Sequence, residues 1–128
     1  MTSLLESNTV EILCRVVIGT VWVFHGLYSK ILDGIPRHRL IVSRILGKKI
    51  GDIATKVIGL LEVLLGLWVF TGWQRIACAI IQTLAIIAMN TLEILLAADL
   101  LISAIGMVVL NLGFLVLIWH WATTRPPT

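Results

Sequence analysis

Two long apolar runs separated by a short polar break make up residues 53–92, which read IATKVIGLLEVLLGLWVFTGWQRIACAIIQTLAIIAMNTL. Each run approaches the roughly 20 residues that a helix needs to cross the hydrocarbon core of a bilayer. The break at 71–74 contains Gly72 and has room only for a tight turn. We therefore predict two membrane-spanning helices that are antiparallel neighbours.

The rest of the chain follows the same pattern. Hydrophobic residues make up 59% of the sequence and charged residues 13%, and the mean hydropathy is +1.02. The period-2 alternation of a membrane β-barrel is missing, so the apolar runs are expected to be helical. We predict an all-α membrane protein, a single domain over residues 1–128, in which four antiparallel transmembrane helices form a bundle. The predicted spans are 11–32, 53–70, 75–92 and 100–121.

Basic residues gather in the connection between the first two spans, at 33–52. We predict a short basic amphipathic helix there, lying along the lipid head groups. By the positive-inside rule this loop is cytoplasmic and both termini lie outside, in what we expect to be a bacterial inner (plasma) membrane. This clustering indicates contact with a lipid bilayer, and we expect no nucleic-acid partner. The predicted head-group contacts are Lys30, Arg37, Arg39, Arg44, Lys48 and Lys49.

Polar residues inside the apolar runs are the candidates for function, because ionisable groups in a membrane are costly and normally have a partner or a task. In the first span, polar positions recur at helical spacing on one face, which is expected to point inward. In the second, Gly59 and Gly66 flank Glu62 and would let a neighbouring backbone approach. By depth, His25 is the easier partner for Glu62. The predicted intramembrane polar cluster is Arg15, His25, Glu62, Gln82, Glu93 and Asn111.

The two cysteines, Cys14 and Cys78, lie at similar depth in their runs. Burial as small apolar residues is the simpler interpretation, and a redox pair is the sharper hypothesis. Their spacing matches no zinc or haem motif, so we expect no metal. Four tryptophans, at positions 68, 73, 119 and 121, are predicted to form an interfacial belt at the end where the termini lie.

The order of motifs resembles that of the DoxX-like family. The resemblance rests on Arg15, Trp22, His25-Gly26 and Lys30 in the first span, on Gly59-x-x-Glu62-x-x-x-Gly66 in the second, and on Asn111-Leu112 in the last. It implies a small four-helix membrane protein. Relatives include a subunit associated with thiosulfate:quinone oxidoreduction and membrane partners in thiol-redox and superoxide-defence assemblies, and most have no assigned reaction.

Three functions remain open at this point. The first is a membrane subunit of a quinone- or thiol-linked redox system, working with a partner oxidoreductase subunit and binding a quinone or other lipophilic ligand near His25 and Glu62. The second is a non-catalytic anchor, assembly factor or chaperone whose polar cluster only orders the helices. A third is a small-molecule carrier acting as a homo-oligomer. No catalytic residue is predicted from the sequence, and whether the protein is an enzyme stays open.

Overall fold

The structure, a computed structural model, describes the backbone of residues 2–123 and the side chains of residues 9–123. Residue 1 and residues 124–128, which belong to the predicted single domain, lie outside the described part. Within it, four helices are long and apolar enough to cross a membrane: Thr9–Ile31, Lys48–Thr71, Arg75–Leu100 and Ala104–Thr123. The prediction of a four-helix membrane bundle with one short additional helix is confirmed.

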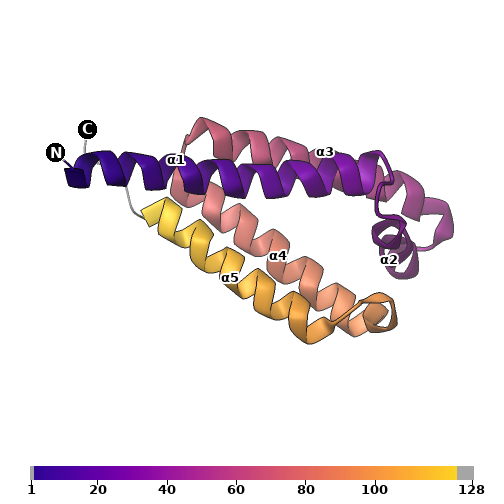
Figure 1. Cartoon of the computed structure of the whole chain (residues 1–128). Helices are drawn as coiled ribbons and strands as arrows, with labels where there is room; N and C mark the ends of the chain where they lie inside the picture. The colour runs from indigo at the N-terminus through magenta and orange to yellow at the C-terminus, as the bar shows by residue number, and fades with distance from the viewer. Residues whose placement is uncertain (1, 124–128) are drawn as a thin grey trace.

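The first span joins an α-helix, α1 (Thr2–Val23), to a π-helix, η1 (Phe24–Ile31). After η1 the short helix α2 (Pro36–Leu46) leads into α3 (Lys48–Thr71), and a tight turn at 72–74 leads into α4 (Arg75–Ala97). A 3-10 turn, η2 (Ala98–Leu100), connects α4 to the last helix, α5 (Ala104–Thr123). The start of α1 and the end of α5 lie at one end of the bundle, here called the terminal end, and α2 lies at the other, the loop end (Figure 1).

Helix boundaries differ from the prediction in the connecting regions. α3 begins at Lys48 rather than 53, α4 continues to Ala97 rather than 92, and α5 begins at Ala104 rather than 100. Hydropathy marks where a helix leaves the hydrocarbon, whereas the backbone ends a helix where a residue breaks the hydrogen-bond ladder. Gly47, with φ +96°, separates α2 from α3, so the charged residues after it simply extend α3.

Glycines bring α1 with η1 against α3. A Cβ added at Gly59 would lie 2.6 Å from the carbonyl oxygen of Gly26, and one at Gly26 would collide with the carbonyl of Gly59. Farther toward the terminal end, a Cβ at Gly66 would lie 2.7 Å from the carbonyl oxygen of Gly19. These two crossings are backbone-on-backbone contacts of the kind that small residues permit between membrane helices. The predicted close approach beside Glu62 is confirmed.

The helices separate toward the loop end. α4 and α5 stay together as a hairpin that meets α1 near the terminal end and diverges from it toward the other (Figure 1). The core lies accordingly at the terminal half, where Ile18, Val69, Cys78, Ile118 and Trp121 are buried. At the loop end α2 spans the opening. It packs on α3, where a Cβ at Gly51 would meet Ser43, and Arg44 Nη1 lies 2.7 Å from Asp99 Oδ1 of η2.

Candidate functional site

The predicted polar cluster is divided among three places along the bundle. Arg15 belongs to the terminal end, Gln82 to the middle, and His25, Glu62, Glu93 and Asn111 to the loop end. The π-turns of η1 change the regular helical spacing within the first span, and the hairpin of α4 and α5 diverges from α1 (Figure 1). Groups that share a face in sequence therefore face different neighbours.

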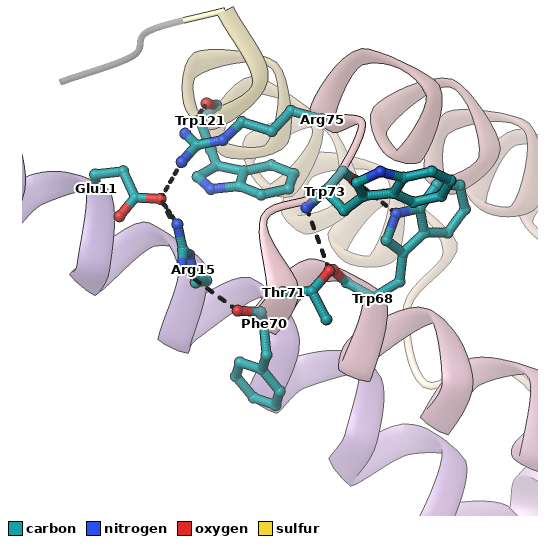
Figure 2. Close-up of polar contacts among 8 residues, drawn as sticks. All are labelled: Glu11, Arg15, Trp68, Phe70, Thr71, Trp73, Arg75 and Trp121. Carbon is teal, nitrogen blue, oxygen red and sulfur yellow. Dashed lines mark hydrogen bonds and ion pairs between the residues drawn. The ribbon is translucent and has the colours of Figure 1, made fainter. Parts of the chain in front are cut away.

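At the terminal end, Glu11 and two arginines form a compact charged group, the terminal arginine cluster (Glu11, Arg15, Arg75). One oxygen of Glu11, Oε1, accepts hydrogen bonds from Nη2 of both arginines and from Nε of Arg15 at 3.0 Å (Figure 2). Each arginine also donates to a main-chain carbonyl: Arg15 Nη1 to Phe70 at 3.4 Å and Arg75 Nη1 to Trp121 at 3.2 Å. The cluster thus joins α1 to α3, α4 and α5.

The predicted tryptophan belt is partly wrong. Trp73 is 66% exposed, and the carbonyl of Trp73 accepts a hydrogen bond of 2.7 Å from Trp68 Nε1 in the turn before α4 (Figure 2). Trp121 instead is 1% exposed and lies in the core with the Arg75 guanidinium over its ring, 5.1 Å from the centroid. Its indole packs against other helices because α5 turns this face toward the terminal arginine cluster.

In the middle of the bundle, Gln82 is fully buried and uses both ends of its amide. Trp22 Nε1 donates to Gln82 Oε1 at 2.7 Å, and Gln82 Nε2 donates to Cys78 Sγ at 3.4 Å. Such satisfied contacts hold helices in register. Cys14 and Cys78 are free, buried thiols within the core, and their pairing as a redox couple stays a prediction.

The loop end contains a cavity of about 740 Å³ between the α1/α3 pair and the α4–α5 hairpin, with α2 forming one wall. Most of its lining is apolar, and it includes Val21, Ile41, Ile86, Met107 and Phe114. We call it the loop-end cavity. Asn111 and Asn90 join α5 to α4 on this wall through a hydrogen bond of 2.8 Å. The ionisable side chains that line it are His25, Lys30, Arg37, His38, Glu62 and Glu93.

Lys30, not His25, is the cation that lies against Glu62. Lys30 Nζ is 2.6 Å from Glu62 Oε1, and both residues are 5% exposed. The contact is an ion pair whose angles fall short of a good hydrogen bond. The predicted His25–Glu62 partnership is therefore wrong, as is the placement of Lys30 among lipid head groups.

The π-helix η1 explains why Lys30, and not His25, lies against Glu62. Leu32 N–H donates to the carbonyl of Leu27, five residues back, at 2.9 Å, and this wider turn changes which positions share a face. Gly26 and Lys30 then both face α3, where a Cβ at Gly59 would lie 2.9 Å from Lys30 Cβ. Regular α-helical spacing does not contain this information.

His25 and His38 stack in the cavity wall, with ring centroids 5.7 Å apart and an angle of 19° between planes. Burial lowers the pKa of His38 to about 4, and the positive charges of Lys30, His25 and Arg37 contribute in the same direction. Its imidazole is therefore neutral at neutral pH. Nδ1 of His38 is buried and has no hydrogen-bond partner among the described residues. Sequence reasoning missed His38 as a site residue because its helix was expected to lie outside the bundle.

The remaining basic residues of the connection differ in their surroundings. Arg37 lines the cavity. Arg39 Nε lies 3.1 Å from Asp33 Oδ1 at the surface, and this hydrogen bond raises the pKa of the guanidinium. Lys48 and Lys49 are exposed. Contact of these side chains with lipid head groups stays a prediction.

Comparison with known proteins gives a family and nothing closer. No curated protein and no solved structure matches the chain. The model of the DoxX-like family matches residues 19–119, which include most of each span and every residue that lines the loop-end cavity. With four candidate membrane spans inside the described residues, the protein is a multi-pass integral membrane protein, and it belongs to the DoxX-like family.

Proposed function

We propose that the protein is a membrane subunit of a redox system and that it binds a quinone, or a lipophile of similar shape, in the loop-end cavity. The observation that carries this proposal is the cavity itself: a mostly apolar space within the bundle, with hydrogen-bonding side chains on η1, α2 and α3 and further ones on α4 and α5. A quinone needs an apolar channel for its tail and donors for its carbonyl oxygens.

The size of the cavity agrees with such a ligand. Sites for small organic molecules commonly enclose about 300–1,000 Å³ with mostly apolar walls and a few polar groups that fix orientation. The loop-end cavity, at about 740 Å³, lies in this range. Apolar residues of α4 and α5 give a wall for a hydrocarbon tail, and the stacked His25 and His38 give a flat surface at the other side.

The charges lining the cavity favour a neutral head group. Lys30 and Arg37 are balanced by Glu62 and Glu93, and His38 is neutral because its pKa lies near 4. An ionic ligand would have to disturb this balance in a medium where unpaired charge is costly. A quinone carbonyl needs only a donor, and His25 or His38 can supply one from a neutral imidazole.

In this function the chain binds and orients the quinone and carries protons to or from it, while a partner oxidoreductase subunit exchanges the electrons. A quinone takes up two electrons and two protons on reduction to the quinol. His25, Glu62 and Glu93 line the cavity as groups that exchange protons. The thiol-linked version of the hypothesis has less support, because Cys14 and Cys78 are buried in the core rather than in the cavity.

The experiment compares two substitutions that each introduce a tryptophan into α5. Met107 lines the cavity, whereas Val109 is 61% exposed on the lipid-facing surface. Protein in lipid nanodiscs is supplied with a short-chain ubiquinone and analysed by native mass spectrometry. We expect a one-to-one complex with the wild type and with Val109→Trp, and loss of most binding with Met107→Trp.

Equal binding by all three proteins, or by none, would reject the cavity as a quinone site. If no quinone binds and Glu62→Gln only lowers thermal stability, the polar groups serve to order the helices. That result would favour the non-catalytic anchor, assembly factor or chaperone over the redox subunit. In that case we expect a partner protein to co-purify with this chain.

A further inference from the structure

We infer that the terminal arginine cluster binds the phosphate group of a phospholipid from the leaflet at the terminal end. This site is at the opposite end of the bundle from the loop-end cavity. Glu11, Arg15 and Trp121 also lie outside the residues that match the family model. The inference is therefore independent of the proposed quinone site.

The first observation is a charge imbalance. Among the side chains that the structure describes, two guanidiniums share a single carboxylate, Glu11. They leave a net charge of +1 (two cations, one anion) in a group of which Glu11 and Arg75 are each 8% exposed. Arginine stays protonated in proteins, and an uncompensated charge at the edge of a bilayer is costly. An anion of the surroundings would remove this imbalance.

The second observation is a buried donor without an acceptor. Trp121 Nε1 has no hydrogen-bond partner within the part of the chain that the structure describes, although Trp121 is only 1% exposed. In Figure 2 the nitrogen-bearing edge of this indole points toward Glu11 and Arg15. A buried N–H normally has an acceptor. An anionic ligand with acceptor oxygens would both accept from this indole N–H and neutralise the surplus positive charge.

Unused donors also face outward. A guanidinium has five N–H groups, and the contacts of Arg15 with Glu11 and Phe70 use three of them. The Arg15 side chain is 29% exposed, so its remaining N–H groups can be reached from the surroundings. Guanidinium is well suited to phosphate because its planar fork matches two phosphate oxygens.

The depth of the cluster selects a lipid phosphate as the occupant. Arg75 is the first residue of its span and Glu11 is near the start of the first one. The exposed Trp73 lies in the turn directly before Arg75, at the level where aromatic side chains meet head groups. α4 also begins without a side-chain cap, so its positive end faces the same level. Basic pockets between membrane helices at this level hold lipid head groups.

The test is native mass spectrometry on protein in nanodiscs that contain a small fraction of phosphatidylglycerol. Arg15→Gln removes one cation of the cluster, and Lys56→Gln is the charge-matched control, because Lys56 is exposed on α3 toward the loop end and lies outside the cluster. We expect Arg15→Gln to lower the fraction of protein that retains one phosphatidylglycerol by roughly tenfold, as the loss of charge-assisted hydrogen bonds predicts. Lys56→Gln should leave this fraction unchanged, and diacylglycerol, which lacks the phosphate, should not be retained.

A third variant keeps the test decisive if Arg15→Gln does not fold. Glu11→Gln preserves the shape of the side chain and raises the charge of the cluster to +2, so retention should increase. The inference would be overturned by equal retention in the wild type and Arg15→Gln, by an equal loss in Lys56→Gln, or by the absence of a gain in Glu11→Gln. Displacement of the lipid by millimolar inorganic phosphate would also overturn it, because the site would then hold a free oxyanion.

Discussion

The ammonium of Lys30 lies 2.6 Å from a carboxylate oxygen of Glu62, with both residues 5% exposed, so η1 and α3 are joined by a buried ion pair beside the loop-end cavity. The pair exists because a π-helix turns Lys30 toward α3 at the place where Gly26 and Gly59 bring the two backbones together. Each charge is acceptable in the bilayer because the other is present.

Removal of one partner should cost more than removal of both. Lys30→Met leaves Glu62 buried and unpaired, and we expect it to lower the free energy of unfolding by about 3–5 kcal/mol. The double variant Lys30→Met/Glu62→Leu replaces the pair by apolar groups and should recover most of that loss. Denaturant titration in mild detergent measures both. If the double variant lost as much unfolding free energy as the single variants Lys30→Met and Glu62→Leu lose together, the result would contradict the pairing.

Alanine at the glycine crossing should separate η1 from α3. Gly26→Ala places a methyl group against the carbonyl of Gly59 and 2.8 Å from the backbone nitrogen of Val63, where no flexible side chain can move aside. Overpacking of this kind costs about 1–3 kcal/mol. Gly113→Ala on α5 is the control, because nothing lies within 4 Å of its added Cβ, and it should be neutral or slightly stabilising. Equal thermal midpoints for the two variants would disprove the close approach.

Hydropathy was sufficient to predict four helices and the antiparallel neighbours at 71–74, because lipid leaves the backbone no alternative to internal hydrogen bonds. The arrangement of the intramembrane polar cluster was harder to predict from the sequence. Gln82 and His25 each lie on the inward face of their helix, as predicted, yet the divergence of α4 and α5 gives them different neighbours. That divergence, like the π-turn that reorients Lys30, arises from packing between distant segments. Local spacing cannot reveal it.

The stability of the protein should fall in mild acid because of His38. Its pKa is about 4 in the folded protein and near 6.5 when unfolded, so the unfolded chain binds the proton more readily. Stability from this group is complete above about pH 6.5 and decreases as the pH falls toward 4, by at most about 3 kcal/mol.

Because carboxylates titrate in the same range, the measurement is a difference between variants. The difference between the thermal midpoints at pH 7 and pH 4.5 should be smaller for His38→Gln than for the wild type, since the variant has no imidazole to protonate. His120→Gln, which changes an exposed histidine, should behave as the wild type does. A pH dependence that is the same in all three proteins would show that His38 titrates normally.

The asymmetry of charge between the two ends of the bundle predicts how the protein is oriented in the membrane. Six Lys and Arg residues fall between Lys30 and Lys49 at the loop end, which by the positive-inside rule puts that end in the cytoplasm. Gln74 lies in the exposed turn of the terminal end and Lys48 is exposed at the loop end, so a single cysteine at each position reports on one side. The native thiols are buried and should react slowly. A membrane-impermeant maleimide added to intact cells should label Gln74→Cys, and it should label Lys48→Cys only after lysis. The reverse labelling pattern would show that the protein has the opposite orientation. The terminal arginine cluster would then lie at the cytoplasmic leaflet, and the loop-end cavity would lie toward the outer face.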